Sequence, residues 1–205
     1  GDVRDKSSLK RIFLEGIDIV IHAAALKHVS FCEEYPFEAV MTNVLGTQNV
    51  VDLSIEFNVE IMLTVSTDKA VNPSSSMGAT KYIAEKLTIN ADRISSKTKF
   101  VCVRFGNVLG TRGSVIPAFL RSIRENGYIV VTDPEVTRFV MPIAEAASLV
   151  IKALNYSGGG EIFVMKMQAI MLMNLVEVFK DIFSKKSPFE IKVIGRLPGE
   201  KSHEE

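Results

Sequence analysis

The sequence predicts an α/β protein with a doubly wound parallel sheet, and three apolar runs carry this prediction. They lie at 17–25 (IDIVIHAAA), 60–67 and 99–106. Continuous runs rich in β-branched residues are typical of strands that are buried on both faces of a parallel sheet. Segments with helical periodicity separate them, at 37–58 and 77–94. This strand–helix alternation is the order that right-handed crossover connections produce.

The second half of the chain is less regular. Its pattern predicts, in order, a glycine-punctuated loop at 106–117, a helix at 118–126, a short strand at 128–133, a helix at 143–154 and a strand at 159–165. We therefore divide the chain at 105. The family resemblance described below implies a partial dinucleotide-binding domain at 1–105 and a small substrate-binding lobe at 106–205, with segments that return to the main sheet.

Composition excludes several classes of protein. The chain has 24 Lys plus Arg and 24 Asp plus Glu, so its net charge is zero and gives no reason to expect binding to nucleic acid or an anionic membrane. No apolar run approaches the ~20 residues that span a bilayer, and no basic-then-apolar leader is present. Cys32 and Cys102 stand far apart without metal-ligand spacing, so we expect no disulfide framework and no metal site. These features predict a soluble cytoplasmic protein.

Small and polar residues follow each of the three strands. In open α/β sheets ligands bind beyond the carboxyl ends of the strands, so 23–28, 67–69 and the chain from 106 onward predict three walls of one cleft. The alanines in the first wall would let a flat ligand approach the backbone, although tight helix packing explains them equally well. Asp68 and Lys69 suggest an acid–base pair, but by pattern alone a solvated loop pair is the more common explanation.

Motifs along the whole chain resemble those of a known superfamily. They are GDVRD, HAAALKHV, TNVLGTQNV, STDKAVNP, MGATK, RFGNVLGTRGSVIP, TRFVM and GEK, in this order. The chain resembles the extended short-chain dehydrogenase/reductases, and within them the UDP-N-acetylglucosamine 4,6-dehydratases of polysaccharide biosynthesis. Retaining dehydratases carry Asp-Glu where this chain has Asp68-Lys69, so the pair resembles the branch that inverts C5.

The resemblance implies a reaction with NADP or NAD as cofactor and a UDP-sugar as substrate. A hydride leaves C4 of the sugar, water is lost across C5 and C6, and the hydride returns to C6. Thr67 would hydrogen-bond O4, Asp68 would protonate the leaving hydroxyl, and Lys69 would act as base or acid at C5. Lys81 matches the lysine of the YxxxK motif, which holds the nicotinamide ribose.

Met77 stands where that motif has its tyrosine, and a subgroup of these dehydratases is similar in carrying methionine there. A thioether has no proton to exchange. Our hypothesis is that Asp68, or a water held by Thr67 and Lys81, accepts the O4 proton.

The resemblance also implies two sets of binding residues, each of which has a surface-loop residue or simple packing as its plainer explanation. Expected at the cofactor are Asp2, Val3, Ala23, Ala24, Ala25 and Lys81. Expected at the substrate are Lys27, Asn43, Asn107, Ser114, Arg138 and Glu200. An Arg fork suits a diphosphate and a Glu suits paired ribose hydroxyls.

The family's phosphate-binding GxGxxG loop does not occur in the sequence, and GDVRD normally closes the third strand. We therefore expect a sheet that lacks its first strands, with an exposed hydrophobic edge and weak or no dinucleotide binding by these residues alone. The chain also ends at a motif where family members continue. Helices at 37–58 and 77–94 resemble a pair that forms an intersubunit bundle, which predicts a homo-oligomer, although their apolar faces would serve equally as internal core.

Two other functions compete with the dehydratase. A sugar-nucleotide 4-epimerase would want a tyrosine at position 77 and would not need Asp68-Lys69. A catalytically silent interaction or assembly module is consistent with Met77 and with the missing phosphate loop.

Overall fold

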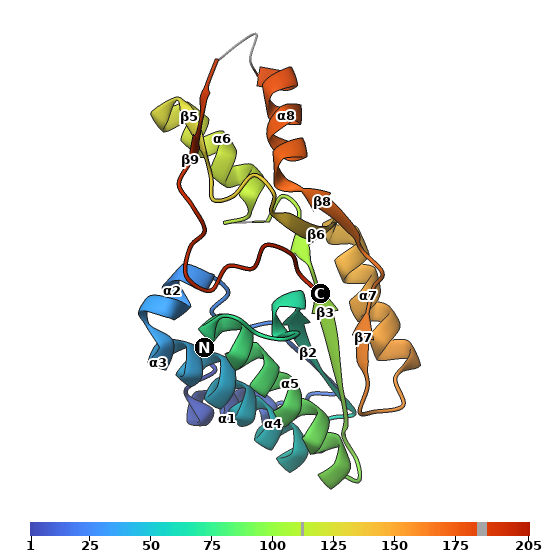
Figure 1. Ribbon diagram of the computed structural model, residues 1–205. Helices are drawn as coiled ribbons and strands as arrows, with labels where there is room; N and C mark the ends of the chain where they lie inside the picture. The colour runs from blue at the N-terminus through green and yellow to red at the C-terminus, as the bar shows by residue number, and fades with distance from the viewer. Residues whose placement is uncertain (112, 184–187) are drawn as a thin grey trace.

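A parallel four-stranded sheet forms the centre of the protein (Figure 1). The computed structural model describes residues 1–111, 113–183 and 188–205. The strand order is β1-β2-β3-β7, with β1 at Ile19–His22, β2 at Ile61–Thr67, β3 at Lys99–Phe105 and β7 at Ile162–Val164. All neighbouring strands are parallel. The predicted doubly wound α/β fold is therefore confirmed.

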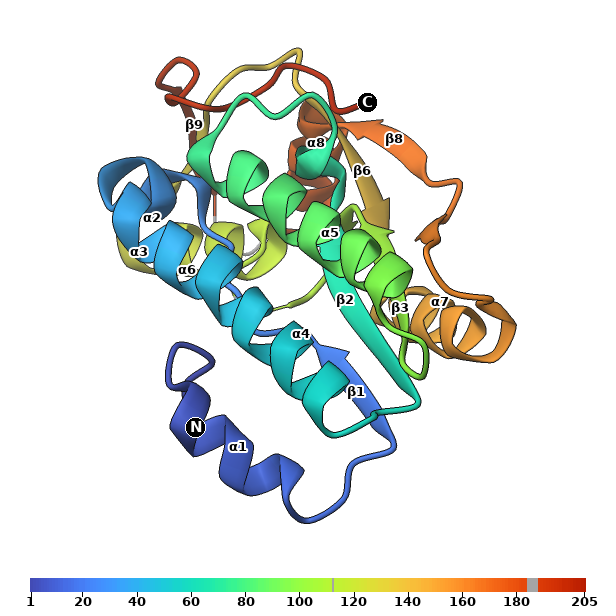
Figure 2. The ribbon, with the colours of Figure 1, turned by 90° about the horizontal axis from the view of Figure 1, so that it is seen from below.

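Helices cover both faces of this sheet. Helices α4 (Gly46–Glu56) and α5 (Ser76–Ile94) lie side by side on one face, and α7 (Ile143–Tyr156) packs on the other (Figure 2). The remaining helices are α1 (Lys6–Phe13), α2 (Val29–Glu34), α3 (Pro36–Ala39), the π-helix η1 (Val40–Leu45), the 3-10 helix η2 (Asp68–Ala70), α6 (Val115–Asn126) and α8 (Leu172–Phe183).

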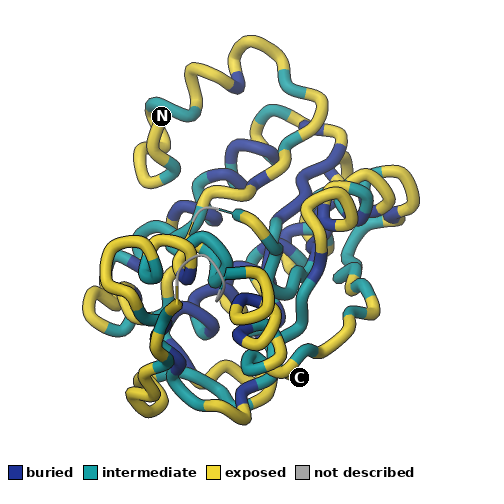
Figure 3. Tube along the Cα trace, turned by 90° about the horizontal axis from the view of Figure 1, so that it is seen from above, coloured by how far each residue is buried: buried dark blue, intermediate teal, exposed yellow. Residues whose placement is uncertain are grey.

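Successive core residues of the central strands pack against helices on opposite faces of the sheet. Met62 and Phe100 pack with Val50 and Leu53 of α4, whereas their neighbour Leu63 packs with residues of α7 on the opposite face. Successive strand residues point to opposite faces, so a helix layer on each face buries the whole apolar run. Figure 3 shows buried stretches in the interior of the molecule, with exposed stretches around them.

Strand β1 departs from the prediction. It is four residues long rather than the nine of 17–25, and Ile19 and Ile21 are each about half exposed. β1 is an edge strand that pairs with β2 alone. Val20 packs against the core, but Ile19 and Ile21 lack a covering layer among the described residues, which agrees with the expected exposed hydrophobic edge.

The segment predicted as one helix at 37–58 is three consecutive helical pieces. A π-helical turn, η1, separates α3 from α4 and contains the buried Asn43. The helix expected at 118–126 begins earlier, at Val115, because Pro117 is tolerated in the first turn of a helix. It ends at Asn126 and is capped by Gly127, whose φ of 72° lies in the left-handed region.

The second half of the chain adds two small sheets. Their strands are β4 (Asn107–Val108), β5 (Tyr128–Val131), β6 (Thr137–Met141), β8 (Gln168–Met171) and β9 (Glu190–Val193), in the orders β4-β6-β8 and β5-β9. Phe119 of α6 and Phe179 of α8 meet edge to face at 5.6 Å in the core of this part. β7 and α7 return to the main sheet, and the division of the chain at residue 105 stays a prediction.

Within residues 1–111, 113–183 and 188–205, no helix combines the length and apolar character needed to cross a membrane. The same residues contain no group of three or more His, Cys, Asp or Glu side chains arranged to hold a metal ion.

Substitution of Gly78 tests how closely α5 packs on η2. A methyl group at this position would collide with the main-chain carbonyl oxygen of Lys69. We expect Gly78→Ala to lower the free energy of unfolding by about 1–3 kcal/mol, because a backbone contact cannot yield as a flexible side chain does. Denaturant unfolding of the variant measures this loss.

The control is Asn90→Ala, an exposed position on the same helix. Its stability should stay within about 0.5 kcal/mol of the wild type. Equal stabilities for the Gly78 and Asn90 variants would contradict the close packing of α5 on η2.

Candidate active site

A cavity of about 370 Å³ lies where the carboxyl ends of β1, β2 and β3 meet. Its walls come from three parts of the chain, the segment after β1, the segment after β2 with the first turns of α5, and the loop after β3. These are the three walls that the strand ends predict. We refer to this cavity as the cleft.

Asp68 and Lys69 share one side of the backbone because β2 ends at Thr67. The chain then turns into the 3-10 helix η2, and the Thr67 hydroxyl donates to Asp68 Oδ1 at 2.9 Å. Lys69 Nζ donates to the same oxygen at 3.0 Å. The Asp68 side chain is only 2% exposed and that of Lys69 22%, so this is a sheltered ion pair and not a solvated loop pair.

Four buried side-chain oxygens have no hydrogen-bond partner in the described part of the chain. They are the hydroxyl oxygens of Ser66 and Ser114, which line the cleft, Asp68 Oδ2 and Glu204 Oε2. Buried polar atoms are seldom left unpaired, because the desolvation cost is not recovered. Groups that donate hydrogen bonds, such as the hydroxyls of a sugar, would satisfy these oxygens.

Lys81 is almost fully buried on α5 and donates a 2.6 Å hydrogen bond to the Val65 carbonyl oxygen. Burial lowers the pKa of Lys81 from 10.5 to about 8, against opposing charge effects of Cys102 and Glu85. The amine therefore gives up its proton more readily than an exposed lysine. Burial, together with the nearby charge of Lys81, also lowers the pKa of His22 to about 4, so that this core histidine is neutral.

Met77 lies one helical turn before Lys81, with its side chain 4% exposed. It lines the cleft and packs with Cys32 and Ala39. The position that would carry a phenol in the YxxxK motif is therefore apolar in this protein, and proton exchange in the cleft must involve other groups.

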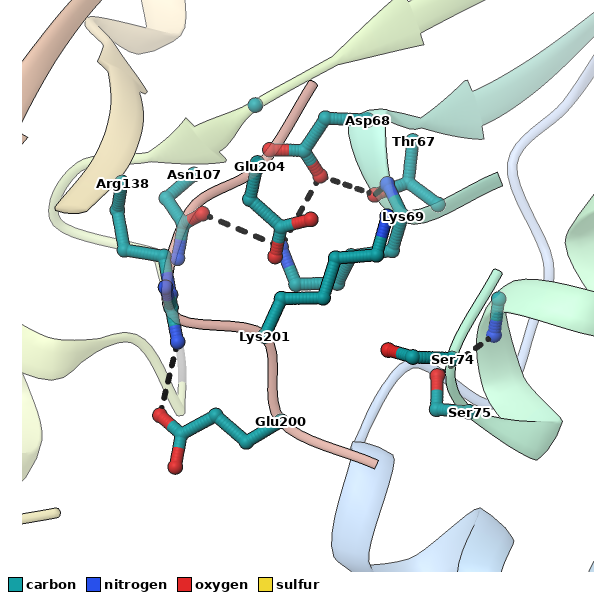
Figure 4. Close-up of polar contacts among 12 residues, drawn as sticks. Thr67, Asp68, Lys69, Ser74, Ser75, Asn107, Arg138, Glu200, Lys201 and Glu204 are labelled. Carbon is teal, nitrogen blue, oxygen red and sulfur yellow. Dashed lines mark hydrogen bonds and ion pairs between the residues drawn. The ribbon is translucent and has the colours of Figure 1, made fainter. Parts of the chain in front are cut away.

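Five of the six predicted substrate residues line one of two cavities. Figure 4 shows three of them, Asn107, Arg138 and Glu200. Lys27, Asn107 and Ser114 line the cleft, and Asn107 Oδ1 accepts a 3.5 Å hydrogen bond from Lys69. Arg138 and Glu200 line a neighbouring cavity of about 220 Å³ and pair with each other at 2.8 Å. Lys69 lines both cavities and lies at their junction.

Asn43 lines neither cavity, so its assignment as a substrate contact stays a prediction. Its side chain is 1% exposed and is occupied by hydrogen bonds to the backbone of Leu26 and to the Thr80 hydroxyl. These contacts hold the segment after β1 against α5. Asn43 thus shapes the wall of the cleft from behind.

Only some of the predicted cofactor residues line the cleft. Ala23 and Ala25 line the cleft with Lys81, whereas Ala24 does not. Asp2 is exposed and pairs with Arg4, and Val3 packs beside Gly46. Both lie outside the two cavities, so the expected contact with an adenine stays a prediction.

Sequence reasoning missed two residues of the site. Ser66 stands inside the STDKA motif, and its position at the end of an apolar strand was an available signal. Glu204 lies near the far end of the chain, yet its carboxylate is 3.1 Å from Lys69 Nζ. No local sequence pattern predicts that contact.

The whole chain, residues 1–205, matches the family model described as polysaccharide biosynthesis protein. The chain belongs to this family. It is 50% identical over its full length to a Methanocaldococcus jannaschii protein described as an uncharacterized membrane protein, of which it covers 63%. It is 43% identical to a Rickettsia rickettsii protein named UDP-glucose 4-epimerase, of which it covers 60%. The chain thus spans less than two thirds of the length of these relatives.

Solved structures share this fold. Pen from Bacillus thuringiensis superposes with a TM-score of 0.95 and 46% identity, over the whole of this chain and 65% of that protein. The dTDP-glucose 4,6-dehydratase DesIV from Streptomyces venezuelae, with NAD and TYD bound, gives a TM-score of 0.90 at 20% identity, over the whole of this chain and 68% of that protein. At that identity the second likeness shows the fold alone.

The lowered pKa of Lys81 makes a prediction about stability. Its folded pKa of about 8 lies below its ordinary 10.5, so between these values the unfolded chain binds more protons and the free energy of unfolding rises with pH. Over the whole window the gain is on the order of 3 kcal/mol. We expect Lys81→Met to lack this rise.

The measurement is urea unfolding from pH 7 to pH 10 for both proteins, with the difference between them plotted against pH. Using the difference removes the opposing effect of Cys102, whose pKa burial raises to about 12. A difference that does not change with pH would contradict a buried, readily deprotonated Lys81.

Proposed function

We propose that this chain carries the active site of a UDP-N-acetylglucosamine 4,6-dehydratase that also inverts C5, acting in polysaccharide biosynthesis. The observation that supports it most is the sheltered Asp68–Lys69 pair, whose lysine lines both the cleft and the neighbouring cavity. A carboxyl group and an amine side by side are suited to removing a proton from carbon while protonating a leaving hydroxyl. Simple oxidation of an alcohol needs no such pair.

The cleft residues fit the nicotinamide end of NAD or NADP. Ala23 and Ala25 leave room for a flat ring beside the backbone, and the unpaired Ser66 hydroxyl and the Lys81 amine face the same cavity. When bound, the cofactor supplies the hydride acceptor for C4 and the hydride donor for C6. NAD is bound in several structures of similar fold, including that of a Thermus thermophilus UDP-glucose 4-epimerase.

Once C4 is a ketone, the proton on C5 becomes acidic. Lys69 handles that proton, and Asp68 protonates the C6 hydroxyl, which leaves as water. Asp68 lines neither cavity, but its Oδ2 has no hydrogen-bond partner among the described residues and is therefore available to carry that proton. Thr67 would hydrogen-bond O4 from the wall formed by the end of β2.

Met77 leaves the O4 proton to other groups. Asp68, or a water held between Thr67 and Lys81, would accept it. The low pKa of Lys81 supports a role for its amine in this exchange, because an amine near neutrality both gives and takes a proton.

A UDP-sugar 4-epimerase is the second candidate, and the names of the Rickettsia relatives favour it. The geometry favours the dehydratase, because Met77 removes the usual phenol while the Asp68–Lys69 pair has no task in epimerisation. An interaction or assembly module without catalysis is the third.

The cytoplasmic location and the homo-oligomer stay predictions. Apolar side chains exposed on η1 and α5, namely Val40, Leu45, Tyr82 and Ile83, support association of two copies through these helices.

The test is to incubate the full-length protein with UDP-N-acetylglucosamine in heavy water and to analyse the sugar by NMR. The proposal predicts a 4-keto-6-deoxy product with deuterium at C5 and inverted configuration there. An unlabelled galacto epimer would establish the epimerase instead. Unchanged sugar from protein that binds the cofactor would reject both enzymes and leave the interaction module.

A further inference from the structure

The last residues of the chain form a strap across the mouth of the site. We call 197–205 the C-terminal strap. It runs back from β9 to the carboxyl ends of β2 and β3 (Figure 1). Hydrogen bonds fix it to neighbouring loops and strands, among them Ser74 Oγ to Gly199 O (3.1 Å), Lys201 Nζ to Val71 O (2.9 Å) and Thr137 N to Ser202 O (2.9 Å).

The strap delivers Glu204 to Lys69. Glu204 Oε1 lies 3.1 Å from Lys69 Nζ, and the Glu204 side chain is 2% exposed. Its other oxygen, Oε2, has no hydrogen-bond partner within the described residues. Figure 4 shows the Glu204 carboxylate close to the Lys69 amine, with Glu204 on the C-terminal strap and Asp68 after the end of β2.

A carboxylate withdrawn from water is costly unless it is paired, so this placement needs a reason. Lysine carries its amine on a flexible four-carbon stem. Two contacts, from Asp68 at 3.0 Å and Glu204 at 3.1 Å, hold that amine at the junction of the two cavities. The two ion pairs thus restrict the Lys69 amine to one position.

The same pairing affects proton transfer. Lys69 lies in ion pairs with Asp68 and Glu204, and an ammonium group in an ion pair cannot accept a proton. Before Lys69 can act as a base, it must pass a proton to a neighbour. Asp68 is already assigned to the leaving hydroxyl, which leaves Glu204 as the adjacent acceptor.

We propose that Glu204 is a positioning residue for the C5 proton transfer and acts through Lys69. One Lys69 N–H bond breaks as an O–H bond forms on Glu204, and the freed amine lone pair then takes the C5 proton. The C–H electron pair stays on the sugar as the enolate of the C4 ketone. This inference rests on the proposed dehydratase function, and it makes the C-terminal strap part of the active site.

The test compares Glu204→Gln with Glu205→Gln in the full-length protein. Glu205 is the matched control, because it lies next in the strap but is more than half exposed and contacts Asn72 and Lys201. We expect Glu204→Gln to slow deuterium incorporation at C5 by about tenfold or more with KM unchanged. Oxidation at C4 should persist, seen as reduced nicotinamide that accumulates in a single turnover.

A second readout does not depend on turnover. Labelling of Lys69 by an amine-acylating reagent, followed by mass spectrometry, should be faster in Glu204→Gln than in the wild type or in Glu205→Gln, because the amine is released. If Glu204→Gln does not fold, Glu204→Asp replaces it, since the shorter side chain withdraws the carboxylate. The same changes are expected there.

Equal or faster C5 exchange in the Glu204 variant, with unchanged labelling, would overturn the inference. Its failure is distinct from failure of the proposed function. In the first case the wild type forms the deuterated product and the variant matches it. In the second the wild type itself forms none, while the labelling comparison still reports on the Glu204–Lys69 contact.

Discussion

The site depends on the ion pair between Asp68 and Lys69 at the end of β2. Asp68 is withdrawn from water, and an isolated carboxylate there would be strongly unfavourable without a cation and a hydrogen-bond donor. Lys69 supplies the cation and Thr67 the hydrogen-bond donor. The short 3-10 turn after the strand makes this possible, because it brings two adjacent side chains to one side. Gly78 lets α5 pack directly on that turn.

Groups able to exchange protons are unevenly distributed around the cleft. The β2 side and the C-terminal strap supply Asp68, Lys69 and Glu204, whereas α5 supplies one buried amine, Lys81, and the inert Met77. Chemistry at a hydroxyl alone would place its base on α5. A concentration of acid and base at the end of β2 instead supports a reaction in which a C–H proton and a hydroxyl are both removed.

Features that follow from local pattern were predictable, and features that depend on distant packing were not. The apolar runs located β2 and β3 because each is buried by helices on both faces. The same pattern overestimated β1, since the exposure of Ile21 depends on what lies across it. Asn43 matched a motif, but its amide is occupied by Leu26 and Thr80. The role of Glu204 could not be predicted from the sequence, because its contact with Lys69 joins distant parts of the chain.

A double-mutant cycle tests the central claim, that Asp68 and Lys69 work as one unit. Single-turnover rates of C5 deuteration would be measured for the full-length wild type, Asp68→Asn, Lys69→Met and the double variant, with retained folding checked for each. The account predicts strong non-additivity, so that the double variant loses little more than the slower single variant. Losses in activation free energy that add across the two substitutions would contradict it.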